Sequence, residues 1–133
     1  MKFNISTTKE FCLKTENTPG MLYKISSLLG EHGVNVNSIS AFIQGNEAIF
    51  RIITNDIETT NKLIEKIDGL IKFNLGDILV VKLNNKPGEL AKVTQILNKN
   101  RIHLESVYII NTKDLTEVAL KPTDLKKAIE ILG

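Results

Sequence analysis

The sequence predicts an α+β fold with two similar units, each an antiparallel sheet that carries its helices on one face. Two observations lead to this prediction. A turn centred on Pro-Gly occurs twice, at Pro19-Gly20 and Pro87-Gly88, and each occurrence lies within the same succession of strand-like and helix-like runs. Self-similarity of this kind indicates a duplicated structural unit.

The two copies share residue types on both sides of the turn. The first copy reads Asn17-Thr18-Pro19-Gly20-Met21-Leu22, and the second reads Asn85-Lys86-Pro87-Gly88-Glu89-Leu90. Further matches pair Leu29 with Leu97, Val34 with Ile102, and Ser38 with Ser106.

In the first unit, a strand-like run at residues 11–14 precedes the turn, and Pro-Gly opens a helix. Thr18 is the expected N-cap, and Pro19 suits the first helical position, where its missing N–H costs nothing. Gly33 can end the helix in the left-handed conformation. The apolar face of this helix is expected to consist of Leu22, Ile25, Leu28 and Leu29.

Two β-rich runs follow at residues 34–43 and 47–54, and Gln44-Gly45-Asn46 joins them as a hairpin. A second helix is expected at about residues 57–67, ended by Gly69, and a further strand at residues 71–75. The order is βαββαβ, the ferredoxin-like pattern of an antiparallel sheet with two helices on one face.

The second unit repeats this order from a strand at residues 78–83. Asn100 is expected to end its first helix in the left-handed conformation, because Arg101 holds the place of Gly33. The hairpin strands are expected at residues 102–110 and 115–121, and Asp124 caps the last helix. Residues expected on the buried helix faces of this unit are Leu90, Val93, Leu97, Leu125, Ala128, Ile129 and Leu132.

The second unit reaches Gly133 just where its last strand is due. Residues 2–6 (KFNIS) resemble residues 72–76 (KFNLG), so this piece is a candidate strand that completes the second unit. Chance similarity in a chain rich in Asn and Lys is the alternative. The expected domains are therefore residues 7–76 and 77–133, with residues 2–6 as an added strand.

Composition narrows the range of functions. The 133 residues are 42% hydrophobic and 24% charged, an ordinary globular balance, and the net charge of +2 is too small to favour nucleic acid or a membrane as partner. No apolar run approaches the ~18 residues of a membrane span, and no signal-peptide core is evident, so a cytoplasmic protein is expected. Cys12 is the single cysteine and is expected to be a small buried hydrophobe.

The two Asn-x-Pro-Gly-x-Leu turns, each set between a strand and a helix, resemble the ACT domain over nearly the whole chain. The layout is similar to stand-alone tandem ACT proteins without a catalytic domain. The resemblance implies a non-catalytic regulatory protein that binds an amino acid, without a cofactor, and pairs through its sheets as a homodimer. It also implies ligands at the interface between ACT units, near the Pro-Gly turns, and a regulated metabolic enzyme as partner.

The turns have chemistry that suits such a ligand. A helix N-terminus presents free N–H groups to a carboxylate, glycine allows close approach, and the Asn amide both donates and accepts hydrogen bonds. Expected ligand-binding residues are Asn17, Thr18, Gly20, Met21, Leu22, Asn85, Lys86, Gly88, Glu89 and Leu90. The alternative is that Pro-Gly only makes a turn and Asn only caps it. Glu89 likewise either holds an ammonium group or merely favours the first helical turn.

Other functions are less well supported. Serine-binding ACT domains carry a His shortly before the Asn, whereas Thr15 and Leu83 stand there in this chain. His32 and His103 lack the partners of a metal site, and Tyr23 and Tyr108 are expected to pack. RNA recognition would need aromatic residues on the central strands to stack on bases, and neither unit carries such a pair in the required strand signature. The sequence also lacks a combination of nucleophile, base and orienting group that would indicate an enzyme. A subunit that docks on a metabolic enzyme without binding a ligand remains the alternative function.

Overall fold

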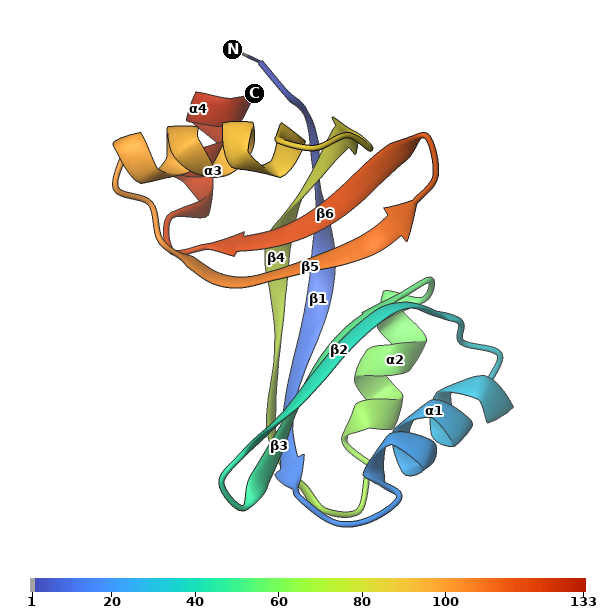
Figure 1. Cartoon of the computed structure of the whole chain (residues 1–133). Helices are drawn as coiled ribbons and strands as arrows, with labels where there is room; N and C mark the ends of the chain where they lie inside the picture. Colours follow the sequence, from blue (N-terminus) through green and yellow to red (C-terminus); the bar gives the residue numbers. More distant parts are fainter. Residues whose placement is uncertain (1) are drawn as a thin grey trace. The chain divides into compact units, whose positions relative to one another are not determined.

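The computed structural model describes residues 2–133 and has ten regular elements. They are β1 (Asn4–Glu16), α1 (Met21–Glu31), β2 (Val36–Gln44), β3 (Glu47–Thr54), α2 (Ile57–Ile64), β4 (Leu70–Asn84), α3 (Glu89–Lys99), β5 (Leu104–Thr112), β6 (Leu115–Pro122) and α4 (Leu125–Leu132). The mixed α+β architecture of antiparallel strands and one-sided helices confirms the predicted fold class (Figure 1).

The chain divides into two compact units. Lys9–Gly76 form one, which we call the contiguous unit, and the segment ending at Thr8 together with Asp77–Gly133 forms the other, the split unit. The strand order is β2-β3-β1-β4-β6-β5, so β1 and β4 each contribute residues to both units. Two runs that the sequence suggested as separate strands, residues 71–75 and 78–83, are one strand, because neither Gly76 nor Asp77 interrupts the extended backbone.

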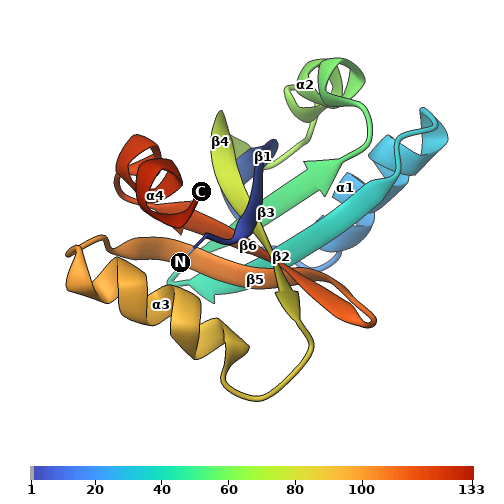
Figure 2. The ribbon, with the colours of Figure 1, turned by 90° about the horizontal axis from the view of Figure 1, so that it is seen from above.

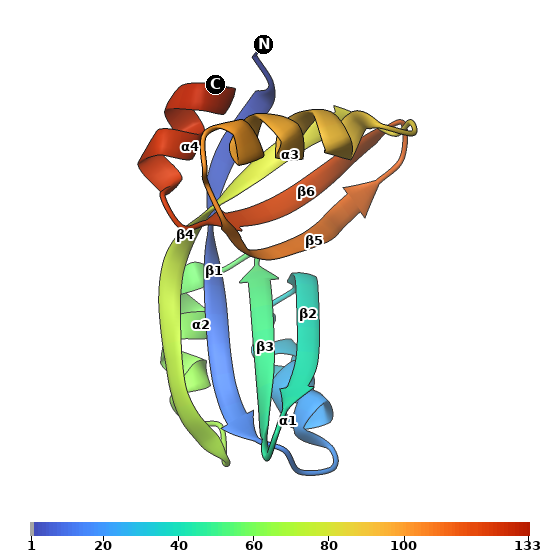
Figure 3. The ribbon, with the colours of Figure 1, turned by 60° about the vertical axis from the view of Figure 1, so that its left-hand side comes forward.

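In the contiguous unit, β2, β3, β1 and the first part of β4 form the sheet, and α1 and α2 lie on one face of it (Figure 3). The hairpin between β2 and β3 pairs Gln44 with Glu47 and turns at Gly45, where φ is 64°. Its core consists of Phe11, Leu13, Met21, Ile25, Leu29, Val34, Ala48, Phe50, Ile52, Leu63, Ile64 and Ile67. Asp56 caps α2 by accepting a hydrogen bond from the Thr59 N–H at 3.0 Å.

In the split unit, α3 and α4 lie together on one side of the sheet (Figure 2). Asp124 caps α4 as expected, accepting from the Lys127 N–H at 3.0 Å. Phe3 and Ile5 pack against the core of this unit, and the Phe3 N–H donates to the Leu132 carbonyl at 2.8 Å. The buried core residues are Leu79, Val81, Leu83, Val93, Leu97, Ile102, Val118, Leu120, Ala128 and Leu132.

Several expected helix details are wrong. Leu22 and Leu90 were expected to be buried, but their exposed fractions are 50% and 44%. Helix α1 begins at Met21, and its buried side is Met21, Ile25 and Leu29. Met21, Ile25 and Leu29 follow one another at intervals of four residues, so Met21 and not Leu22 continues the buried side in the first turn.

The end of α3 also differs from expectation. Asn100 has φ −97°, and it is Arg101 that takes the left-handed conformation, with φ 57°. Gly33 does so after α1, with φ 73°, as predicted. The backbone geometry is therefore repeated position by position, even where the second copy lacks glycine.

Candidate functional site

The Pro-Gly pair before α1 forms a reverse turn outside the helix. The Met21 N–H donates to the Thr18 carbonyl at 3.4 Å, and Gly20 has φ 82° and ψ 7°. Proline followed by a glycine of positive φ is the pattern of a type II turn. Thr18 therefore does not cap the helix through its side chain, and Pro19 is not the first helical residue, which corrects both expectations.

The second turn has the same geometry. Gly88 has φ 87° and ψ −9°, and the Glu89 N–H donates to the Lys86 carbonyl at 3.4 Å. A Cβ built on either turn glycine would meet nothing within 4 Å. Positive φ, which favours glycine, thus explains both glycines without invoking a nearby group.

Neither α1 nor α3 has a side-chain cap within the described residues. Intrahelical bonding begins with the Lys24 N–H to the Gly20 carbonyl in α1, and with the Lys92 N–H to the Gly88 carbonyl in α3. The N–H groups of the preceding residues, such as Leu22 and Leu90, are consequently available to a carboxylate.

A cavity of about 290 Å³ adjoins the first turn. All five residues expected to bind a ligand there line it, namely Asn17, Thr18, Gly20, Met21 and Leu22. The opposite wall comes from β2 and β3, through Ala41, Phe42, Ile43, Ala48 and Phe50. Met21 is 4% exposed and belongs mainly to the core, whereas the exposed Leu22 side chain is free to touch a ligand.

The hairpin wall was missed by the sequence reasoning. Alternation breaks down at Ala41-Phe42-Ile43, three consecutive apolar residues that are all exposed. Exposed apolar side chains at the end of an edge strand are typical of a binding surface, and this run was the available signal.

A backbone hydrogen bond joins the two walls of this cavity. The Asn17 N–H donates to the Asn46 carbonyl at the hairpin tip, at 3.1 Å. Within residues 2–133, no hydrogen bond of the Asn17 side chain is observed, so its amide can serve a ligand.

A smaller cavity of about 180 Å³ adjoins the second turn. Of the expected residues, Asn85, Lys86, Glu89 and Leu90 line it, and Gly88 does not. The remaining lining residues are Leu83, Asn84, Val107, Ile109, Thr112, Thr116 and Val118.

Two polar side chains at the second cavity already have protein partners. The Asn85 N–H donates to the Asp114 carbonyl, as at the first turn, and its side-chain Nδ2 donates to the Lys113 carbonyl at 3.1 Å. The Glu89 carboxylate lies 3.3 Å from the Lys92 ammonium, one turn along α3. Both residues therefore have structural roles here, and the amide oxygen of Asn85 is the part that is left for a ligand.

The other candidate residues form no second site. His32 follows α1 and its Nδ1 lies 2.9 Å from the Leu28 carbonyl, while His103 is exposed. Tyr23, expected to pack, is 75% exposed, and Cys12, expected to be buried, is only partly so. Among residues 2–133, no cluster of His, Cys, Asp or Glu could hold a metal ion, and no helix is long and apolar enough to cross a membrane.

Comparison with known families identifies the segment that contains the first turn and cavity. Residues 13–72 match the ACT domain family. The ACT match thus spans α1, the β2–β3 hairpin and α2 of the contiguous unit. No curated protein sequence matches the chain.

Solved structures that resemble the chain extend over both units. The protein BT0572 from Bacteroides thetaiotaomicron has a TM-score of 0.85 at 23% identity, covering 96% of this chain and 87% of that one. The regulatory subunit of aspartate kinase from Thermus thermophilus has a TM-score of 0.65 at 17% identity, covering 98% and 96%. Aspartokinase alpha and beta subunits give 0.69 at 14% identity, covering 98% and 95%. At these identities the likeness shows a common fold.

Proposed function

We propose that this chain is a non-catalytic regulatory protein of two ACT units that binds an amino acid beside its Asn-x-Pro-Gly turns. The ACT match at residues 13–72 carries the proposal. The fold likeness to an aspartate kinase regulatory subunit, over almost the full length of both chains, is consistent with it.

The split unit is the second ACT unit of this proposal. Support comes from geometry that repeats although the side chains differ. Gly20 and Gly88 have φ values of 82° and 87°. In both units the Asn of the motif donates its N–H to the tip of the following hairpin, to Asn46 or to Asp114.

In the first cavity, the ligand carboxylate accepts hydrogen bonds from N–H groups at the start of α1, that of Leu22 foremost. The Met21 N–H already points to Thr18 and is the weaker donor. The Asn17 amide and the Thr18 hydroxyl face the polar end of the ligand, since both residues line the cavity. The ammonium group needs such acceptors because a buried, unpaired charge is costly.

A facing ACT unit closes the site in this proposal. Phe42 and Ile43 line the cavity on the edge strand β2, yet their exposed fractions are 48% and 67%. Pairing of two copies as a homodimer would cover them. Ligand binding then tightens the association of the units, and this coupling is how the protein would signal to a metabolic enzyme.

Calorimetric titration with the twenty amino acids tests the function, with Asn17→Ala and Asn85→Ala as a matched pair. Asn17→Ala keeps the backbone N–H that holds the hairpin and removes only the amide, so binding weakens while the melting temperature stays. Asn85→Ala removes the bond to Lys113, so it lowers the melting temperature.

Two results would count against the proposal. Wild-type protein that binds no amino acid would favour the alternative, a subunit that docks on an enzyme without a ligand. Binding that neither Asn variant changes would place the site away from the turns. Valine at Gly20 or Gly88 is unsuitable for this test, since positive φ makes either substitution disturb the turn itself.

A further inference from the structure

The two cavities differ in the charge of their lining residues. None of the ten residues that line the first cavity is ionisable. Seven of them are apolar, namely Met21, Leu22, Ala41, Phe42, Ile43, Ala48 and Phe50. The second cavity includes Lys86 and Glu89 in its lining and is smaller. These two charged residues belong to the second turn and the start of α3, whereas the hairpin wall of that cavity differs from the first by including Thr112 and Thr116.

We infer that the site in the contiguous unit selects an amino acid with an apolar side chain. This inference rests on the proposed function, and it names the ligand class. The polar residues of the cavity, Asn17 and Thr18, belong to the turn, where the carboxylate and ammonium groups of every amino acid would lie. The ligand side chain therefore meets the hairpin wall, which is apolar.

The free energy of desolvation decides which side chains the hairpin wall favours. A lysine or aspartate side chain directed at Phe42 and Ile43 would lose water and gain no counter-ion, which is unfavourable. A leucine-, isoleucine-, methionine- or phenylalanine-like side chain removes apolar surface from water on both sides, which is favourable. A hydroxyl group, as in threonine, would find no hydrogen-bond partner on this wall.

Wild-type protein is titrated calorimetrically with leucine, phenylalanine, methionine, threonine, lysine and aspartate. The inference expects the three apolar amino acids to bind at least about tenfold more tightly than the other three. Ile43→Asp places a carboxylate on the wall at an exposed position, so it should weaken leucine binding by at least about tenfold and improve lysine binding. Ile39→Asp is the matched control, because Ile39 lies on the same edge strand, is 39% exposed and does not line the cavity.

Leu22→Ala provides a second variant on the helical wall, in case Ile43→Asp does not fold. It should weaken binding of leucine and phenylalanine and leave that of threonine within about twofold, because only the larger side chains lose contacts. Tighter wild-type binding of lysine, aspartate or threonine would overturn the inference while leaving amino-acid binding established. Ile39→Asp altering selectivity as much as Ile43→Asp would also overturn it, since selection would then come from the strand edge. If wild-type protein binds none of the amino acids, the proposed function fails as well.

Discussion

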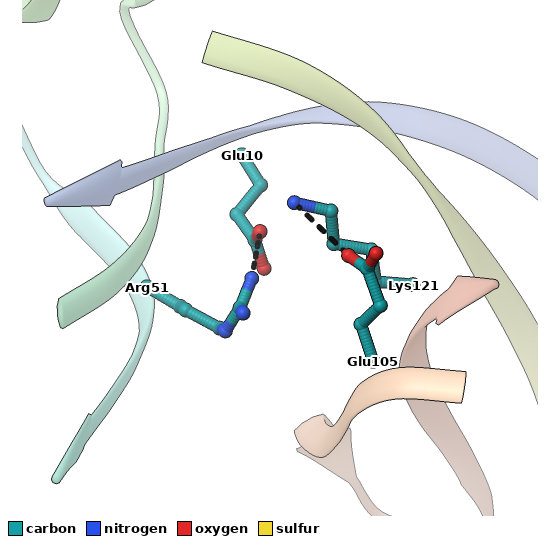
Figure 4. A network of polar contacts seen from close by, with 4 residues as sticks. All are labelled: Glu10, Arg51, Glu105 and Lys121. Atoms are coloured by element: carbon teal, nitrogen blue, oxygen red, sulfur yellow. Dashed lines mark hydrogen bonds and ion pairs between the residues drawn. The ribbon is translucent and has the colours of Figure 1, made fainter. Parts of the chain in front are cut away.

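The Arg51 guanidinium lies 3.0 Å from the Glu10 carboxylate, and the side chains are only 13% and 1% exposed (Figure 4). Figure 4 also draws the Lys121–Glu105 pair, whose charged atoms are 3.6 Å apart and whose side chains are 27% and 50% exposed. The two ion pairs should contribute differently to the free energy of unfolding, and the difference in burial matters more than the difference in distance. Removing Arg51 takes a close opposite charge away from the buried Glu10 carboxylate, whereas the remaining member of an exposed pair is solvated by water.

Arg51→Met should therefore lower the free energy of unfolding by about 3 kcal/mol, measured by urea titration. Lys14→Met is the control, because its pair with Glu47 is 3.5 Å long and both side chains are about one-third exposed. It should cost less than about 1 kcal/mol. Equal costs for the two variants would show that burial of Glu10 does not strengthen its interaction with Arg51.

Core leucines and cavity leucines on the same helices should behave differently. Leu29→Ala or Leu97→Ala should each cost about 2–5 kcal/mol, because both side chains are 1% exposed and leave a cavity when truncated. Leu22→Ala or Leu90→Ala should cost less than about 1 kcal/mol, since these side chains are half-exposed. Denaturant unfolding of the four variants checks this, and a large loss at Leu22 would mean that it packs in the core after all.

Arg101 is the non-glycine residue with positive φ within the described chain, so it carries backbone strain that glycine would relieve. Arg101→Gly should stabilise the protein by about 1 kcal/mol. Gly33→Ala, at the same position after α1, should destabilise it by a similar amount. The prediction fails if thermal unfolding shows Arg101→Gly to be less stable than wild type.

Asp56 makes the stability of α2 dependent on pH. Hydrogen bonds from the backbone N–H and then the side chain of Thr59 hold the pKa of Asp56 below the ordinary value. Because the folded pKa is depressed, the charged cap stabilises the protein above the unfolded pKa of about 3.9, and this contribution is lost as pH falls through the folded value. Asp56→Asn keeps a capping oxygen without the charge. The melting-temperature difference between wild type and Asp56→Asn should therefore shrink on acidification below about pH 4, and a constant difference would contradict the pKa shift.

Residues 4–8 should stabilise the split unit, since Ile5 packs against its core. Deleting the first seven residues should cost about 3 kcal/mol or more, in line with losing two part-buried apolar side chains and a strand. Ile5→Asp should reproduce part of this loss, and Thr7→Asp, an exposed position on the same strand, should not. Unchanged melting of the truncated protein would rule out this role.

The sequence predicted the four hairpin strands to within two residues, because hydrophobic spacing and turn residues are local signals. The long strands β1 and β4 were each predicted as two separate runs, residues 2–6 and 11–14 and residues 71–75 and 78–83. The predicted start of the first helix was wrong, because the same three residues fit two different local structures. Proline at the first position of a helix and proline in a type II turn look identical as Thr18-Pro19-Gly20, and in the structure the turn precedes a helix that begins at Met21. The hairpin wall of the site could not be assigned, because Leu22 and Phe42 line the same cavity only as a result of tertiary packing.

Because β1 and β4 contribute residues to both units, the two units can complete their folding only in a fixed order during translation. Residues 9–76 are continuous, so the contiguous unit can fold once Gly76 has left the ribosome. The split unit needs residues 4–8, which are made before the contiguous unit, and residues 77–133, which are made after it. Residues 4–8 therefore remain without the rest of their unit while residues 9–76 are translated. A ribosome-bound chain from which residue 76 has just emerged would carry one complete unit and one N-terminal strand segment whose partners in the split unit are still missing.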